Sequence, residues 1–357
     1  MDGGTGHARD HCRGCSLTAE SVPLRSLGAF MSVCLIAGGA GFLGSHLAEA
    51  LVARGDTVRI VDNFTIGSPD NLASLGSRVE IIPGDLCSHA LVRRATAGVN
   101  RVFHFAMPCG LAPPGPYYEP AAGAVGTWHL LLAARDAGCR DVVLASCAGV
   151  YGRCEQSPVN EDDSALPCTA AGRDALLAEQ EAVSFARSFG MRLLRLRYFN
   201  VYGPRQSPLS AGPNVRRILE SMLDGRRPVL YDHELPEQDL MFVDDAVRGC
   251  LLALDRDRAD GRVYHIALGR PIRAEELVAH LNAILGTDLQ PLLAGPCSTV
   301  PPAPLPDVTR ARVELGFSGE IDLDEGLRRC VEYFRAHGGD SGAPAFTADP
   351  WRRSATY

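Results

Sequence analysis

Residues 32–62 read SVCLIAGGAGFLGSHLAEALVARGDTVRIVD, and this stretch decides the fold. The apolar run Ser32–Ala37 predicts a strand, and Thr57–Val61 predicts a second strand after a loop. Between them, Ser45–Arg54 has apolar residues at helical spacing and follows the glycine-rich turn Gly38–Gly44. Strand, glycine-rich turn, helix and strand in this order are typical of the βαβ unit that binds a dinucleotide.

Each conspicuous residue of this unit has a physical role in such a site. Gly38 permits the tight turn, Gly41 lets the backbone approach a pyrophosphate, and Gly44 lets the helix pack closely on the strand. The free N–H groups and the dipole at the helix N-terminus favour phosphate. Asp62 can accept both ribose hydroxyls and would repel a 2′-phosphate, which favours NAD(H), although NADP(H) stays open because the acid can rotate away.

Alternating strands and helices continue along the chain. Val79–Pro83, Arg101–Phe105 and Asp141–Ser146 predict strands, and Tyr118–Ala137 predicts a long helix. Repeated βα units predict an α/β fold, a Rossmann-type doubly wound parallel sheet with a smaller C-terminal substrate-binding lobe. The expected organisation is a flexible leader at 1–30, a dinucleotide-binding domain at 31–200 to which 238–268 returns, a substrate lobe at 201–237 and 269–335, and a flexible tail at 336–357.

In such a sheet, ligands bind outside the carboxyl ends of the strands. The residues expected to contact the cofactor are Gly38, Gly41, Phe42, Leu43, Gly44, Asp62, Asn63, Asp85, Leu86, Phe105 and Ala106. The expected substrate contacts are Met107, Ser146, Cys147, Tyr151 and Asn200.

Composition excludes several classes of function. The net charge of −7 argues against nucleic acid as the main partner, because phosphate binding needs clustered cations. The chain contains no lysine, so Schiff-base chemistry and a lysine general base are impossible. No apolar run reaches the length of a membrane span and Met1–Ser26 lacks the apolar segment of a signal peptide, so a cytoplasmic location is expected. His11, Cys12 and Cys15 have no second ligand pair, and no metal site is expected.

Several motifs resemble the extended short-chain dehydrogenase/reductase family, which includes nucleotide-sugar epimerases, dehydratases and decarboxylases. They are Gly38–Gly44, Val61–Asn63, Gly84–Leu86, Phe103–Ala106, Val150–Gly152, Leu196–Arg205, Phe242–Ala246 and Glu314–Phe317. This resemblance implies a dinucleotide cofactor and an Asn-Ser-Tyr-Lys catalytic tetrad, in which the Tyr moves the proton and the Lys lowers its pKa.

The chain departs from the family at all four tetrad positions. Counted from neighbouring motifs, Gly123 stands at the Asn position, Cys147 at the Ser position, Ala171 at the Tyr position and Ala175 at the Lys position. Since neither alanine has a titratable group, this pair cannot act in general acid/base catalysis. Two arginines usual for a sugar diphosphate are also missing, because Gln238 stands at one position and the segment Pro301–Pro306 replaces the other.

Three functions remain open. The first is an NAD(P)H-dependent ketoreductase that reduces an aromatic polyketide of angucyclinone type in antibiotic biosynthesis, with its proton supplied by the substrate or by water. This pattern resembles the atypical ketoreductases of actinomycete polyketide pathways. The second is a nucleotide-sugar epimerase or dehydratase with a relocated acid and base, and the third is a non-catalytic dinucleotide-binding protein. A small-molecule substrate is the expected partner, and the family resemblance implies a homodimer through the helices Tyr118–Ala137 and Ala171–Phe189.

Overall fold

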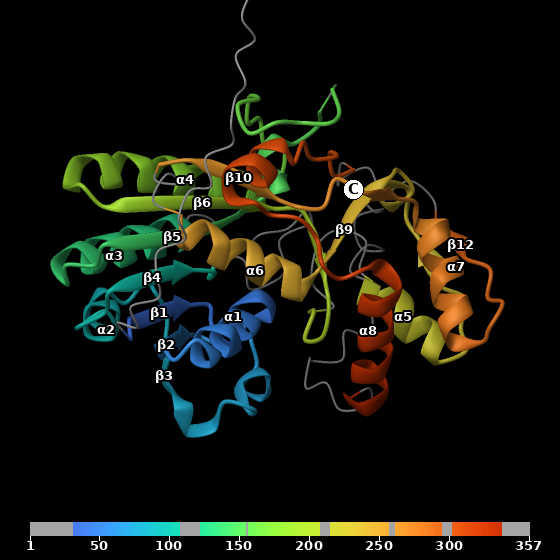
Figure 1. Ribbon diagram of the computed structural model, residues 1–357, viewed down its shortest axis with the longest axis horizontal. Coiled ribbons are helices and arrows are strands. Elements are labelled where there is room, and N and C mark those ends of the chain that lie inside the picture. The colour runs from blue at the N-terminus through green and yellow to red at the C-terminus, as the bar shows by residue number, and fades with distance from the viewer. Residues whose placement is uncertain are drawn as a thin grey trace, which may run out of the picture.

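A parallel seven-stranded sheet forms the centre of the larger lobe (Figure 1). The computed structural model describes residues 31–107, 122–154, 156–207, 215–256, 261–294 and 302–337. The strand order is β10-β6-β5-β4-β1-β2-β3, which reverses direction at β1 and so confirms the doubly wound fold. The strands are β1 (Val33–Ala37), β2 (Thr57–Asp62), β3 (Val79–Pro83), β4 (Arg101–His104), β5 (Asp141–Cys147), β6 (Arg192–Tyr198) and β10 (Val263–Ile266).

Helices cover both faces of this sheet, which explains why its strands are apolar on both sides. One face packs against α2 (His89–Ala95), α3 (Ala122–Asp136) and α4 (Ala170–Phe189). The opposite face packs against α1 (Phe42–Ala53) and α6 (Val243–Leu254). Figure 1 shows the two groups of helices on opposite sides of the strands.

A second, smaller core lies beside the large sheet. Its apolar residues come mainly from α5 (Val215–Leu223), α7 (Ala274–Leu285) and α8 (Leu323–His337). Figure 1 shows these helices grouped together at the side of the molecule, in yellow to red. Two small sheets accompany them, with the orders β11-β9-β7 and β12-β8. Their strands are β7 (Asn200–Tyr202), β8 (Val229–Leu230), β9 (Gln238–Phe242), β11 (Pro271–Ile272) and β12 (Leu292–Leu293).

The structure changes several expected boundaries, and three of the changes bear on the site. Helix α1 begins at Phe42 rather than Ser45, because Gly41 is its N-cap and the glycine-rich turn runs straight into the first helical turn. Strand β5 continues to Cys147. The segment 238–268 does not return to the large sheet as one unit. Strand β9 pairs with β7 and β11, and only α6 and β10 join the larger lobe.

Some expectations fall on residues outside the described ranges. These are the leader at 1–30 with His11, Cys12 and Cys15, the start of the helix expected from Tyr118, and the tail from Gly338. Within the described residues, α3 begins at Ala122.

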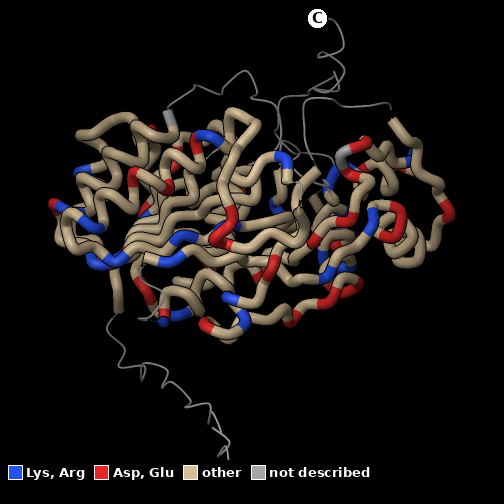
Figure 2. Tube along the Cα trace, turned by 90° about the horizontal axis from the view of Figure 1, so that it is seen from above, with Lys and Arg blue, Asp and Glu red and all other residues tan. Residues whose placement is uncertain are grey.

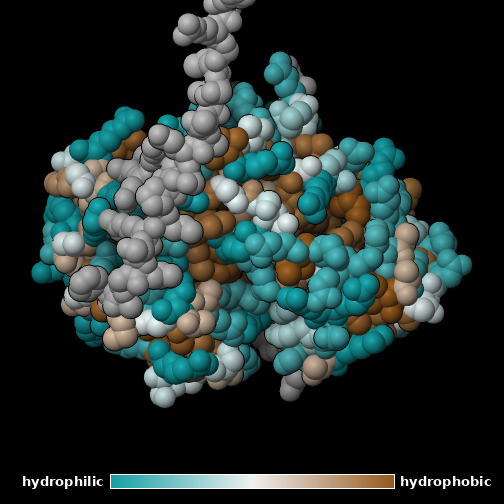
Figure 3. Space-filling model, in the orientation of Figure 1, coloured by the Kyte–Doolittle hydropathy of each residue, from teal (hydrophilic) through white to brown (hydrophobic). Residues whose placement is uncertain are grey.

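Charged residues of both signs are interspersed along the described chain, as the Cα trace in Figure 2 shows. Hydrophilic side chains cover most of the face drawn in Figure 3, with small apolar areas between them. Among the described residues, no helix has the length and apolar character needed to cross a membrane. The described part of the chain also contains no group of three or more His, Cys, Asp or Glu placed to hold a metal ion.

Candidate active site

The glycine-rich turn leaves no room for side chains between β1 and α1. Gly38 has a φ of +79°, and a Cβ atom on it would lie 2.6 Å from the backbone nitrogen of Ala106. A Cβ atom on Gly44 would lie 2.2 Å from the carbonyl oxygen of Gly38. The N–H groups of Phe42, Leu43 and Gly44 are in the first turn of α1, where an α-helix provides them with no internal acceptor. This cradle fits the pyrophosphate of a dinucleotide.

Asp62 ends β2 beside this turn, where a ribose would lie. Its carboxylate accepts hydrogen bonds of 2.9 Å from the backbone N–H groups of Ala40 and Phe64. Burial raises the pKa of Asp62, and the two hydrogen bonds oppose that shift by stabilising the charged form. Asp62 therefore shapes the turn as well as offering acceptor oxygens to a ligand.

Asn63 and Asp85 lie next to each other at the carboxyl ends of β2 and β3. The side-chain amide of Asn63 donates a 2.8 Å hydrogen bond to Asp85, and the carbonyl oxygen of Leu86 contacts His129 Nδ1 at 3.0 Å. The predicted cofactor residues thus lie at the carboxyl ends of β1 to β4, as the strand order requires.

His104 at the end of β4 is a buried histidine that stays neutral. It is 2 % exposed, and burial lowers its pKa to about 4. Its Nε2 atom lies 2.8 Å from Thr127 Oγ1 on α3, and that hydroxyl donates to the carbonyl oxygen of Gly123 at 2.7 Å. These contacts link Gly123, at the expected Asn position, to the end of β4. Because its pKa is lowered, His104 is not protonated near neutral pH.

The Ser and Lys positions of the tetrad lie together. Cys147 ends β5, and Ala175 on α4 packs in the same apolar cluster, with Met107 against it. The start of α4 packs closely on η3 (Ala148–Tyr151), because a Cβ atom on Gly172 would lie 2.3 Å from the carbonyl oxygen of Gly149. Ala171 is one residue before this contact and is also buried. The chain therefore presents methyl and thiol groups where the family resemblance implies a phenol, an ammonium and a hydroxyl.

Ser146 and Asn200 are buried polar residues with unfilled hydrogen-bonding capacity. Ser146 precedes Cys147 on β5, and because strand side chains alternate, the two point to opposite faces of the sheet. The Ser146 hydroxyl and the Asn200 side-chain nitrogen have no hydrogen-bond partner within the described ranges. Buried polar atoms of this kind usually bind water or a ligand. Asn200 therefore stays a substrate-contact candidate, whereas Ser146 lies on the face away from Cys147.

Tyr151, expected to contact substrate, is instead enclosed in a buried polar network. It is 2 % exposed, and its hydroxyl lies 2.5 Å from His265 Nε2 and accepts a 2.7 Å hydrogen bond from Arg197. Arg197 in turn donates two hydrogen bonds to Glu179 on α4, at 2.9 and 2.7 Å. Burial raises the pKa of Tyr151 to about 12 and lowers that of His265 to about 4. These contacts hold the turn after β5 in place and leave the Tyr151 hydroxyl no open side toward a substrate.

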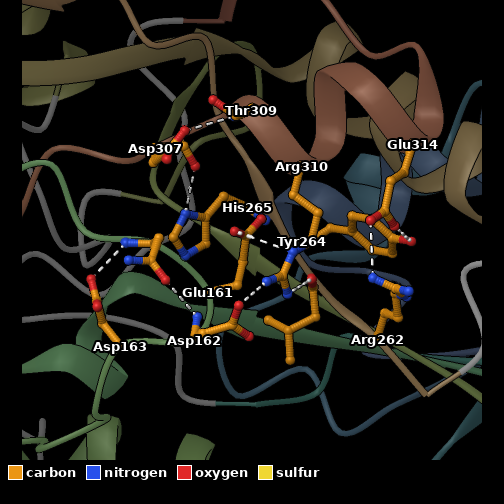
Figure 4. Close-up of polar contacts among 12 residues, drawn as sticks. Glu161, Asp162, Asp163, Arg262, Tyr264, His265, Asp307, Thr309, Arg310 and Glu314 are labelled. Atoms are coloured by element: carbon orange, nitrogen blue, oxygen red, sulfur yellow. Dashed lines mark hydrogen bonds and ion pairs between the residues drawn. The ribbon is translucent and has the colours of Figure 1, made fainter. Parts of the chain in front are cut away.

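The same network extends to two loops that are distant in sequence, as Figure 4 shows. The His265 ring donates through Nδ1 to the carbonyl oxygen of Asp307 at 2.9 Å, and the His265 backbone N–H donates to Glu161 at 3.0 Å. Arg310 pairs with Glu161 and Asp162. Sequence reasoning missed this network, because Tyr151 and His265 are 114 positions apart and no local pattern links them.

The arginine that persists from the family motif is also used internally. Arg205, which has a φ of +65°, donates to Glu49 on α1 at 2.6 Å and to Ser45 at 3.3 Å. Gln238 is buried on β9, and residues 302–306 carry no cation in the described part of the other expected segment. Neither of these two positions therefore provides a cation within the described residues.

Comparison with known proteins agrees with this geometry. A model of the NAD dependent epimerase/dehydratase family matches residues 34–267, from β1 through β10. The chain belongs to this family. A dTDP-glucose 4,6-dehydratase from Streptomyces griseus is 32% identical over 320 residues, covering 85% of this chain and 94% of that enzyme.

Two solved structures of family members are similar to this chain over nearly their whole length. The UDP-glucose 4-epimerase of Thermotoga maritima, solved with UDP-glucose, has a TM-score of 0.78 and 30% identity, and the match covers 85% of this chain and 99% of that one. The dTDP-glucose 4,6-dehydratase of Streptomyces venezuelae, solved with NAD, has a TM-score of 0.75 and 27% identity, with coverage of 86% and 98%.

Proposed function

We propose that this family member is an NAD(H)-dependent oxidoreductase that reduces a carbonyl group of a nucleotide-linked sugar. The substrate class is supported by the relatives, whose names are those of enzymes acting on UDP- and dTDP-sugars. Of the functions left open by the sequence, the relatives favour a nucleotide-sugar enzyme over a polyketide ketoreductase.

The observation that carries the proposed mechanism is the pair Ala171 and Ala175. Neither alanine nor any lysine can give or take the proton that accompanies hydride transfer. In carbonyl reduction the reacting carbon is positioned by binding, and the proton then comes from water or from the substrate.

The residues of the turn and its edge fit the cofactor. Gly38 and Gly44 provide the close backbone approach, the N-terminus of α1 provides the phosphate contacts, and Asp62 provides acceptors for ribose hydroxyls. When bound, NADH supplies the hydride. Cys147 and Ala175 lie in one buried apolar cluster, and the Asn200 amide has a donor free for the substrate among the described residues.

An aromatic polyketide ketone is the second candidate substrate. It is favoured by the apolar character of Cys147, Ala171 and Ala175 and by Gln238 at a position where a diphosphate usually meets arginine. A flat apolar ring system suits such a surface better than a polyhydroxylated sugar does.

The first experiment is to follow NADH and NADPH oxidation at 340 nm with two panels of substrates, nucleotide 4-ketosugars and aromatic polyketide ketones. Turnover of the ketosugars supports the proposed nucleotide-sugar substrate. Turnover of the aromatic ketones alone would replace it with the second candidate substrate. Cofactor binding without turnover on either panel would contradict an oxidoreductase and leave a non-catalytic dinucleotide-binding protein.

A variant pair tests the role of α4. Ala171→Tyr places a phenol at the proton-donating position, and Ser184→Tyr places the same group on an exposed site of the same helix. If proton delivery limits carbonyl reduction, Ala171→Tyr raises kcat by about tenfold or more, because a positioned acid usually contributes at least that much. Ser184→Tyr leaves kcat unchanged, and equal effects of both changes would contradict the assignment.

A homodimer is proposed for the assembly. Val125 and Trp128 on α3 and Leu177 and Phe189 on α4 are all exposed, although they are large and apolar. Helices α3 and α4 pack side by side, so these residues belong to neighbouring elements. A second copy of the chain would cover such a face.

A further inference from the structure

Two exposed cysteines bracket the loop that leads from η3 into α4. Cys154 follows the turn after β5, and Cys168 immediately precedes Thr169, the N-cap of α4. The described exposed cysteines are these two and Cys87, which lies in a different part of the fold, before α2. Cys154 and Cys168 thus stand apart from the buried cysteines of the sheet core.

The two chain segments that carry these cysteines pack directly against each other. A Cβ atom on Gly152 would lie 3.1 Å from the backbone nitrogen of Cys168 and 2.1 Å from the carbonyl oxygen of Leu166. Gly152 is two residues from Cys154, and its φ of +65° forms the turn that brings the segments together. The segment that carries Cys154 therefore packs against the segment that carries Cys168, with the point of contact two residues before Cys154.

Electrostatics agrees with this proximity. Burial raises the pKa of the Cys154 thiol, and the nearby Asp163 carboxyl and the Cys168 thiol raise it further. The Cys154 thiol lies 3.9 Å from the Tyr151 carbonyl oxygen, next to Gly152, on the turn that packs against Cys168.

We propose that Cys154 and Cys168 form an intrachain disulfide when the protein meets a small-molecule disulfide such as oxidised glutathione. One cysteine thiolate attacks the small disulfide, forms a mixed disulfide and releases one glutathione thiolate. The second cysteine thiolate then attacks the mixed disulfide at the protein sulfur, forms the Cys154–Cys168 bond and releases the second glutathione thiolate. Two protein thiols are oxidised, one glutathione disulfide is reduced, and the two protons go to the released thiolates.

The bond would close a loop whose interior is already anchored to the rest of the fold. Within the loop, the Asn160 carbonyl oxygen contacts the Tyr151 hydroxyl at 3.1 Å, and Glu161 accepts from the His265 backbone. The disulfide adds a covalent link next to Thr169, where α4 begins and Ala171 follows. It would fix the start of α4 relative to η3, a modification that the proposed reaction does not require.

The sequence makes this bond directly measurable. Trypsin cuts after Arg153 and Arg173, so a single tryptic peptide, residues 154–173, contains both cysteines and no other. The full-length protein is treated with oxidised glutathione, its remaining thiols are alkylated before unfolding, and the digest is analysed by mass spectrometry. The intrachain disulfide leaves this peptide unalkylated and lighter than the reduced peptide by two hydrogen atoms.

Variants separate this outcome from its competitors. Cys168→Ser leaves Cys154 as a mixed disulfide with glutathione, while Cys87→Ser, at an exposed cysteine outside the loop, leaves the 154–173 disulfide unchanged. Two glutathione adducts on the wild-type peptide, two alkyl groups, or a pair of peptides joined between chains would each overturn the proposal. The measurement needs no enzymatic activity, so it stands or fails independently of the proposed function.

Discussion

At the scale of single residues, the glycine-rich turn and Asp62 lie at the carboxyl ends of the strands, and the changes expected on the reacting side stay a prediction. Gly38, Gly44 and Asp62 have local signatures, so the sequence alone predicted where they lie. Cys147 and Ala175 were assigned by counting from motifs, and they lie in one apolar cluster. Their catalytic consequence stays a prediction. The enclosure of Tyr151 was not predictable, since it depends on His265, which is contributed by a strand more than a hundred residues away.

Gly44→Ala should abolish tight NADH binding. The added methyl group would lie 2.2 Å from the Gly38 carbonyl oxygen, so either the turn or the first turn of α1 must move. We expect the Kd for NADH to rise at least about tenfold, measured by fluorescence titration.

Gly98→Ala is the matched control for that change. Gly98 has a φ of +73° and no atom within 4 Å of an added Cβ, so alanine there brings backbone strain without a collision. It should lower the free energy of unfolding by about 1 kcal/mol and leave NADH binding intact. Unchanged NADH binding in Gly44→Ala would show that the turn does not hold the cofactor.

Asp62→Asn should weaken NADH binding and reduce the preference for NADH over NADPH. The amide has one acceptor oxygen, so it cannot serve both Ala40 and Phe64 and a ribose, and it no longer repels a 2′-phosphate. The measurement is the ratio of the Kd values for NADPH and NADH. Asp224→Asn, at an exposed aspartate of the smaller lobe, should leave the ratio unchanged, and an equal change in both variants would refute the role of Asp62.

At the scale of elements, strands β1 to β5 of the large sheet were predicted to within one residue at each end, because they are short apolar runs, whereas β6 and β10 were not predicted as strands. The placement of β9 was wrong. Its five residues are all buried, and such a pattern does not tell which sheet a strand joins. The pairing of Gln238 with Ile272 and of Asn200 with Leu240 decides this, and neither pairing is visible in a local stretch of sequence.

Trp128→Glu should convert the proposed homodimer into a monomer. Trp128 is 43 % exposed and stacks edge-on against Phe185 at 5.5 Å, so the substitution changes the α3–α4 face with little effect on the sheet core. Light scattering after size-exclusion chromatography measures the mass. Val313→Glu changes an even more exposed apolar residue, at 75 %, and should leave the mass unchanged. A monomeric wild-type protein would contradict the dimer.

At the scale of the whole molecule, buried polar groups join segments of the larger lobe that are far apart in the sequence. Tyr151, His265 and Glu161 connect the turn after β5, the edge strand β10 and the loop that precedes α4. The general fold could be predicted from the alternating strand and helix pattern. The contacts among these three segments could not, because hydrogen bonds between distant loops depend on the completed structure.

The buried histidines should make the protein sensitive to mild acid. His104 and His265 have pKa values lowered by burial to about 4, so below the ordinary value of 6.5 the unfolded chain binds protons that the folded chain does not. The contribution of these neutral histidines to the free energy of unfolding is therefore complete above pH 6.5 and is lost as the pH falls toward 4. For each histidine, the free energy of unfolding should decrease by about 2 kcal/mol between pH 7 and pH 5.

Urea denaturation at several pH values tests this expectation. His265→Gln should be less stable than the wild type at pH 7 and should show a shallower decline in unfolding free energy toward pH 5. His337→Gln, at an exposed position near the end of α8, should follow the wild-type curve. Parallel curves for His265→Gln and the wild type would refute the linkage.

The contact between Arg310 and Asp162 also bears on how the protein is made. It joins residues 148 positions apart, and Val159 is likewise paired with Pro306. At roughly 5–20 residues per second, a ribosome needs about 7–30 s to synthesise the chain between them. During that interval the turn after β5 and the loop before α4 have left the ribosome without their final partners. During synthesis, the turn after β5 and the loop before α4 are therefore exposed for a time without their final contacts. In that period a chaperone could bind these segments, or a protease could cleave them.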